Sequence, residues 1–114
     1  MARRRMMSLD IMDNPPFIDC SIEARYLYLE ITVRADDSGF CNVTHRLLRM
    51  IGCSEASLAE LIDCGLLLRF DSGLIVVRDW LLANRISDNR KVSTIYKEEE
   101  RRLDIADDGR YSII

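Results

Sequence analysis

The chain has 114 residues, of which 48% are hydrophobic, and its formal net charge is -3. This length and composition suffice for one modest hydrophobic core, so we expect one domain and not two. An acidic chain has no overall electrostatic attraction to a polyanion, so any contact with nucleic acid must come from local basic patches.

Neither a cofactor nor secretion is indicated by the sequence. The cysteines at 20, 41, 53 and 64 form no CxxC pair, and the single histidine, His45, has no partner at metal-binding spacing. We therefore expect reduced thiols, no zinc site and no cofactor. No run of ~18 apolar residues is present, and the segment after the N-terminal arginines is too polar for a signal peptide. The sequence predicts a cytoplasmic protein that does not enter a membrane.

The N-terminal quarter predicts an interrupted helix followed by a longer one. Pro15 and Pro16 end any helix that begins within residues 8–13. Ser21 is a favourable N-cap, and it predicts a helix over residues 22–35.

The predicted helix 22–35 is apolar over most of its surface, with its charged residues on one side. Apolar positions such as Tyr26 and Val33 lie outside the charged side, so we expect this helix to lie at the centre of the core. Residues 36–39 are turn formers, and residues 40–41 are too few for more than a short strand.

Two short helices are predicted next, separated by a tight turn. Asn42 can cap a helix over residues 43–51, which Gly52 ends; Ser54 caps a third helix that stops at Gly65. Such a pair of helices is typical of a helix-turn-helix. The residues expected to face inward are Val43, Leu47, Met50 and Ile51 in the first of the pair, and Leu58, Leu61 and Ile62 in the second.

Residues 66–70 and 74–77 are predicted strands around a short turn, and together they form a hairpin. The order helix, short strand, helix, helix, hairpin is that of a winged helix-turn-helix, in which the hairpin is the wing. The predicted fold class is therefore mainly α with a small β-hairpin, over residues 9–84. Trp80 is expected to close its core and not to stack on a base.

The two ends of the chain are predicted to flank this domain. Residues 1–8 form a basic arm, and residues 85–114 form a tail that is first basic and then acidic. The glutamates and arginines of residues 98–102 allow helical ion pairs, so we expect the tail to be partly helical. Residues 104–114 are expected to be frayed.

Positive charge gathers outside the third helix, which in the usual docking geometry enters the major groove. Glu55, Glu60 and Asp63 on this helix are expected to be exposed, and a carboxylate that faces phosphates loses hydration. We therefore expect contacts to the DNA backbone, with steep salt dependence and slight sequence preference. The predicted DNA-binding residues are Arg3, Arg4, Arg5, His45, Arg46, Arg49, Arg85, Arg90, Lys91 and Lys97.

The same basic residues can also be explained without any contact to DNA. The N-terminal arginines are also compatible with a solvated tail. Arg46 and Arg49 are compatible with an ordinary wet helix face, paired with Asp36, Asp37 or Glu55.

Several motifs together resemble a known family. RADDSGF at residues 34–40 is followed by RMIG at 49–52, and DNRK at 88–91 precedes TIY at 94–96. With these motifs, most of residues 4–98 resembles the N-terminal domain of phage replisome organisers, and more remotely the winged-helix N-terminal domain of DnaD-type primosomal proteins. The resemblance implies binding of origin DNA in replication initiation and recruitment of the host helicase or its loader. Family members are often longer, so the chain corresponds to a domain or a truncated relative.

Two alternative functions remain open. The chain is also compatible with an oligomerisation or protein-docking module without direct DNA contact, because the strand 74–77 is expected to have an exposed edge and the third helix is acidic. A homo-oligomer would follow from this function. A transcriptional regulator is a further alternative, since the fold does not decide function. An enzyme is not expected, because the sequence has one histidine and no glycine-rich phosphate loop.

Overall fold

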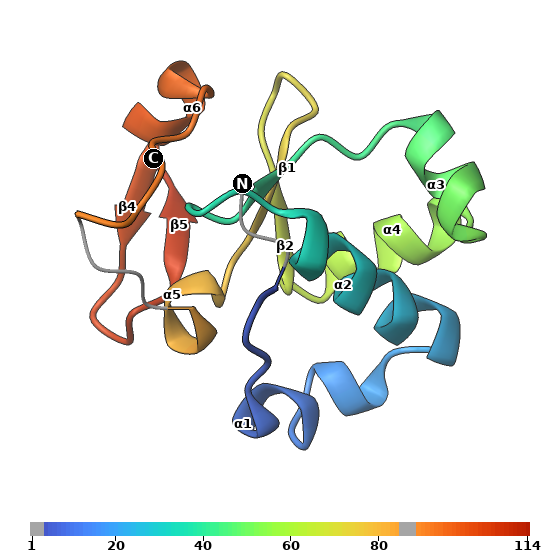
Figure 1. The fold of residues 1–114 in the computed structure, drawn as a ribbon. Helices are drawn as coiled ribbons and strands as arrows, with labels where there is room; N and C mark the ends of the chain where they lie inside the picture. The colour runs from blue at the N-terminus through green and yellow to red at the C-terminus, as the bar shows by residue number, and fades with distance from the viewer. Residues whose placement is uncertain (1–3, 85–88) are drawn as a thin grey trace.

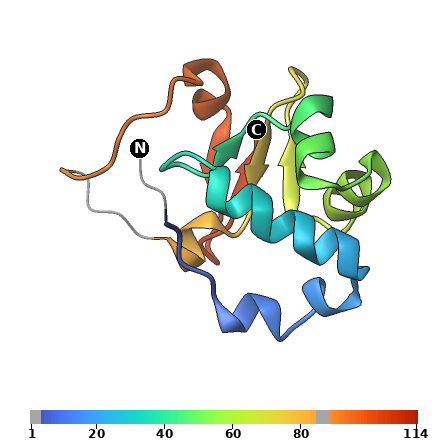
Figure 2. The same cartoon turned by 45° about the vertical axis from the view of Figure 1, so that its right-hand side comes forward.

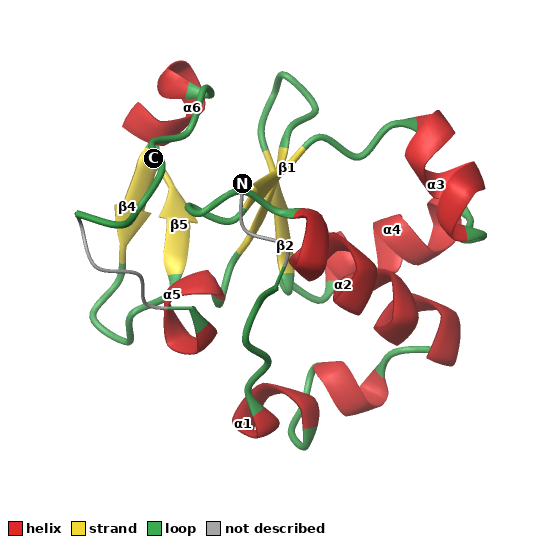
Figure 3. Ribbon diagram, in the orientation of Figure 1, coloured by secondary structure: helices red, strands yellow, loops and turns green. Residues whose placement is uncertain are grey.

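Residues 4–84 and 89–114 are described by the computed structural model, in which helices pack against a small antiparallel sheet (Figures 1 and 3). The mainly helical fold with a small amount of β-structure is as predicted. The elements are α1 (Leu9–Met12), the 3-10 helix η1 (Phe17–Asp19), α2 (Ile22–Arg34), β1 (Phe40–Cys41), α3 (His45–Ile51), α4 (Glu55–Asp63), β2 (Leu67–Arg69), β3 (Ile75–Val77), α5 (Trp80–Ala83), α6 (Lys97–Arg101), β4 (Leu103–Ile105) and β5 (Tyr111–Ile113).

Helix α2 begins and ends close to where the sequence predicted. The Ser21 hydroxyl accepts a hydrogen bond from the Ala24 N–H at 3.1 Å, which caps the helix. Its burial differs from the prediction, because Tyr26 and Val33 are 48% and 46% exposed. Only one face of α2 is covered, and residues three or four apart share that face. The buried residues are Ala24, Leu27, Tyr28, Ile31 and Thr32.

Helix α3 begins later than predicted. The cap is Thr44 and not Asn42, since the Thr44 hydroxyl accepts a hydrogen bond from the Leu47 N–H at 3.1 Å. The chain is still extended after β1, so the first hydroxyl that reaches a free helical N–H is that of Thr44. Met50, predicted to face inward, is 68% exposed, whereas Leu48 is buried. Only the side of this short helix that carries Leu48 is fully covered.

The boundary between α3 and α4 is as the sequence predicted. Gly52 has a φ of 92°, the left-handed conformation that glycine adopts most readily, and it ends α3. Ser54 caps α4 by accepting a hydrogen bond from the Ser57 N–H.

The strand β3 lies in the middle of its sheet, in the order β1-β3-β2. Phe40 of β1 pairs with Val76 on one side, and Leu68 of β2 pairs with Val76 on the other. The predicted exposed edge at residues 74–77 is therefore wrong, because the short strand β1 covers it. Every residue of β3 is buried.

Residues 104–114, predicted to be frayed, belong to an ordered hairpin of β4 and β5 (Figure 1). Tyr111 is buried in the core, its N–H donates to the Arg78 carbonyl at 2.9 Å, and its hydroxyl donates to the Ser38 carbonyl at 3.0 Å. The prediction failed because the apolar residues of this hairpin, such as Leu103, Tyr111 and Ile113, pack against core residues that are distant in the sequence. Burial raises the pKa of the Tyr111 hydroxyl to about 12.

Candidate nucleic-acid interface

The exposed face of α3 carries the strongest basic candidates. His45, Arg46 and Arg49 are all exposed, and the two arginines are three residues apart, so they project from one side of the helix. Within the described part of the chain, neither arginine forms an ion pair, so the predicted pairing with Asp36, Asp37 or Glu55 is absent. His45 lies 3.3 Å from Glu55.

The N-terminal arginines do not form a uniform arm. Arg3 lies outside the described residues, and Arg4 is exposed. Arg5 is 2% exposed at its side chain and forms an ion pair with Asp37 at 2.9 Å. The prediction that Arg5 contacts DNA is therefore wrong in this structure, because its guanidinium is already bound inside the protein.

The binding site of Arg5 is the acidic turn, residues 36–39. One Arg5 nitrogen pairs with Asp37, another donates to the Ala35 carbonyl at 2.7 Å, and the guanidinium lies 5.3 Å from the centre of the Trp80 ring. The N–H of Val92 and the Arg5 guanidinium hold the pKa of Asp37 below its usual range. Trp80 is buried, as predicted, and its indole N–H donates to the Asp37 carbonyl at 3.0 Å.

The C-terminal basic residues belong to a segment that is hydrogen-bonded to the acidic turn. Arg85 lies outside the described residues, Arg90 is exposed, and Lys91 is half-buried. The chain beyond them is held to the turn, because the Thr94 hydroxyl donates to Asp36 at 2.6 Å and the Val92 N–H to Asp37 at 2.8 Å. Lys97 is 54% exposed at its side chain and lies 3.7 Å from Glu100 on α6.

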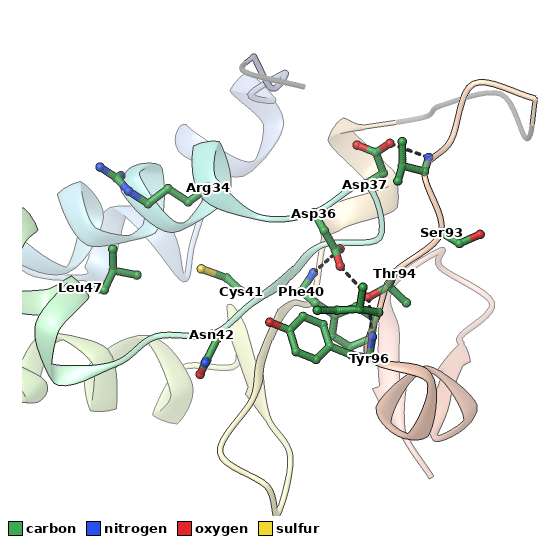
Figure 4. Close-up of a pocket in the computed structure, with 12 residues that line it drawn as sticks. Arg34, Asp36, Asp37, Phe40, Cys41, Asn42, Leu47, Ser93, Thr94 and Tyr96 are labelled. Atoms are coloured by element: carbon green, nitrogen blue, oxygen red, sulfur yellow. Dashed lines mark hydrogen bonds between the residues drawn. The ribbon is translucent and has the colours of Figure 1, made fainter. Parts of the chain in front are cut away.

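A groove of about 450 Å³ separates the α3 basic face from this C-terminal segment (Figure 4). Leu47 of α3 lies on one side and residues 92–95 on the other, with Phe40 and Tyr96 between them (Figure 4). The two aromatic rings lie 5.9 Å apart. Arg34 also lines the groove, but its guanidinium is paired with Glu30. The lining is mainly apolar, so the groove does not itself attract phosphates.

Helix α4 has fewer free carboxylates than the sequence predicted. Both oxygens of Glu60 are occupied: they accept from the N–H and the hydroxyl of Ser21 at 2.6 and 2.8 Å. In the opposite direction, Glu23 of α2 accepts from the hydroxyls of Ser54 and Ser57 at the start of α4. Each helix thus supplies a carboxylate to the N-terminus of the other, where backbone N–H groups and the helix dipole favour negative charge.

These contacts lower the pKa of both glutamates. The serine hydroxyls of α4 lower the pKa of Glu23, and the backbone and hydroxyl of Ser21 lower that of Glu60. The ionised forms stabilise the fold above the ordinary glutamate pKa of 4.5, and this contribution is lost as the pH falls through the lower folded-state values. Glu55 and Asp63 remain exposed on α4, so its outer surface is still acidic.

The structure adds one cation that the sequence analysis did not single out. Arg69, the last residue of β2, is exposed and forms no ion pair with the residues that the structure describes. The alternation of a strand would place Arg69 on the same face as the buried Leu67, so the strand pattern gave no signal for its exposure. The hairpin tip beside it contacts α6, where Ser72 donates to Glu99 at 2.7 Å and Asp71 lies 3.5 Å from Arg102.

Comparison of the chain with protein-family models, with curated proteins and with solved structures gives no match. In residues 4–84 and 89–114, no helix is long and apolar enough to cross a membrane. The same residues contain no group of three or more His, Cys, Asp or Glu side chains that could hold a metal ion.

Proposed function

We propose that the chain is a winged helix-turn-helix protein that binds the DNA backbone during the initiation of phage DNA replication. The order α2, β1, α3, α4, β2, β3 supports the fold, with the β2-β3 hairpin as the wing. The sequence resemblance to phage replisome organisers supports the role in replication, including a contact with the host helicase or its loader. The observation that carries DNA binding is the exposed, unpaired state of Arg46 and Arg49 among the described residues.

The charge distribution favours α3 over α4 as the principal contact. Glu55 and Asp63 on the outer surface of α4 would face phosphates if that helix entered the major groove, at a cost in hydration. Arg46 and Arg49 carry no such cost, since each can neutralise a phosphate and release the counterion condensed on the DNA there. Arg4 and Arg90, both exposed, add to this contact. Binding is therefore expected to tolerate changes of sequence and to depend strongly on salt.

The test is the affinity of the full chain for a fluorescently labelled duplex, measured by anisotropy across a salt series. The double variant Arg46→Ala, Arg49→Ala should bind more weakly on every sequence. Because two phosphate contacts are lost, the slope of log K against log salt should decrease in magnitude by about 2.

A matched control is Arg101→Ala with Arg102→Ala, which removes the same charge from α6. These arginines are exposed and lie beside Glu98 and Asp71. The control should keep the wild-type salt slope, apart from a small change in affinity from net charge. If both double variants lose affinity equally, or if the wild-type chain does not bind at low salt, α3 is not the DNA-binding face.

A second function, self-association, is favoured by an apolar stripe on α2. Ile22, Tyr26 and Val33 are 74%, 48% and 46% exposed, and Leu29 between them is half-buried. Figure 2 shows α2 at the front of the molecule with no other element drawn across it. In an antiparallel pair about a two-fold axis, Ile22 would face Val33 of a second copy and Tyr26 would face Leu29, so the stripe is self-complementary.

Light scattering over a concentration series tests this alternative. If α2 mediates self-association, Val33→Glu should convert a dimer to a monomer, because two buried carboxylates would face the apolar stripe. Ile105→Glu, at a 57% exposed position on β4, is the control and should leave the dimer intact. A wild-type chain that stays monomeric at all concentrations, and binds DNA, excludes this second function.

A further inference from the structure

Two of the four cysteines lie in contact, although 44 positions separate them in the chain. Cys20 caps the end of η1 and precedes Ser21, the N-cap of α2, and Cys64 follows the last residue of α4. Their Sγ atoms are 3.8 Å apart. A disulfide requires about 2.05 Å between the sulfurs, so a movement of less than about 2 Å joins them.

The thiol pair faces solvent through a surface hollow. Cys20 and Cys64 both line this hollow, together with Glu60 and Asp63. Cys20 is 6% exposed and Cys64 is half-buried, so reagents reach Cys64 first.

The other two cysteines have no sulfur partner. Cys41 is buried in β1, and the Cys53 thiol donates to the Glu23 carbonyl at 3.9 Å. All four cysteines lie in the part of the chain that the structure describes, and the contact between Cys20 and Cys64 is the one sulfur contact among them.

We propose that Cys20 and Cys64 form a dithiol site, which hydrogen peroxide converts to a disulfide and which trivalent arsenicals bridge. This proposal does not depend on DNA binding. It revises the expectation of four reduced thiols, because two sulfurs in contact can be oxidised to one disulfide.

The oxidation proceeds in two balanced steps. The Cys64 sulfur attacks one peroxide oxygen, the O–O bond breaks, and the hydroxide that leaves takes up the thiol proton as water, so Cys64 becomes a sulfenic acid. The Cys20 sulfur then attacks the Cys64 sulfur, the S–O bond breaks, and the second water leaves with the Cys20 proton. Peroxide is reduced to two waters, and two thiols become one disulfide.

The environment of the two sulfurs assigns these roles. Cys20 is 6% exposed, and burial and the neighbouring Cys64 raise the pKa of its thiol to about 12, so Cys20 is not the sulfur that meets the oxidant. Its contact with Cys64 places it to act in the second step, in which its proton leaves with the water. The Cys20 thiol donates to the Pro16 carbonyl at 3.4 Å and the Cys64 thiol to the Leu61 carbonyl at 3.3 Å. These weak hydrogen bonds must break before the sulfurs approach each other.

The disulfide would join the start of α2 to the end of α4, next to the hydrogen bonds between Ser21 and Glu60. Such a cross-link closes a long loop in the unfolded chain and lowers its entropy. The exposed residues of α3 do not line the hollow, so oxidation is expected to leave them unchanged.

The experiment uses the full chain, reduced, freed of reductant and treated with hydrogen peroxide. Free thiols, counted after denaturation, should fall from the four of the reduced chain to two. Peptide mapping should find the Cys20–Cys64 disulfide, and the unfolding temperature should rise by about 10 °C. Phenylarsine oxide, added to the reduced chain without oxidant, should bind once per chain.

Cys53→Ser is the matched control, and it should keep both the disulfide and the arsenical adduct. Cys64→Ser, at a half-buried position that tolerates the change, should abolish both and leave Cys20 free. The proposal is overturned if Cys20 and Cys64 stay reduced while Cys53 is oxidised, if Cys64→Ser still binds the arsenical, or if the disulfides are only between chains.

Discussion

Gly39→Ala is expected to lower the free energy of unfolding by about 3 to 4 kcal/mol. Gly39 has a φ of 95°, and a Cβ at this position would lie 2.7 Å from Cγ of Trp80. Trp80 cannot retreat, because it is 1% exposed and its indole N–H is bonded to the Asp37 carbonyl. The substitution therefore combines a strained backbone with an overpacked core.

Urea denaturation followed by the fluorescence of Trp80, the single tryptophan, measures this loss. Gly73→Ala is the matched control: Gly73 has a φ of 91°, but no atom lies within 4 Å of the added Cβ. It should cost only the backbone strain, about 1 kcal/mol. Equal losses for the two variants would show that contact with Trp80 does not decide the choice of glycine at position 39.

Tyr111→Ala is expected to lower the free energy of unfolding by about 3 kcal/mol, although only three residues follow Tyr111 in the sequence. Tyr111 is 7% exposed within the main core, and its hydroxyl donates to the Ser38 carbonyl at 3.0 Å. Removing the ring leaves a cavity under the β4-β5 hairpin and a buried carbonyl without its donor.

Thermal and urea unfolding of Tyr111→Ala and Tyr111→Phe separate these two contributions. The phenylalanine variant loses only the hydroxyl and should cost about 1 kcal/mol, so the difference between the variants measures the packing of the ring. If Tyr111→Ala unfolds like the wild type, the C-terminal hairpin does not belong to the cooperative core.

Both positions are tied to the acidic turn: Gly39 is its last residue, and Tyr111 donates a hydrogen bond to it. Asp37 binds Arg5 from the N-terminal segment and Val92 from the C-terminal segment, and Ser38 accepts from Tyr111. The two ends of the chain therefore converge on this turn. One consequence for function is that the basic N-terminal segment is anchored to the domain at Arg5, so of the described residues only Arg4 extends its charge outward.

Local signals in the sequence determined most of the helix boundaries. Ser21 and Ser54 were identifiable as caps because a serine hydroxyl before a helix satisfies a free N–H within the next turn, whatever the rest of the fold does. Gly52 was identifiable as a helix end because its left-handed conformation disfavours other residues. The same reasoning placed the wrong cap on α3, because Asn42 and Thr44 are both suitable residues and only the length of β1 chooses between them.

The tertiary structure alone decided which charges are free and what covers the central sheet. Arg5 and Glu60 looked like exposed charges, yet each has partners 30 to 39 positions away. The hairpin that buries Tyr111 has the composition of a frayed tail, and the contact between Cys20 and Cys64 has no sequence motif. Hydrogen-bond caps and glycine turns act over a few residues and can be read locally, whereas ion pairing, burial and thiol contact depend on which distant segments the fold brings together.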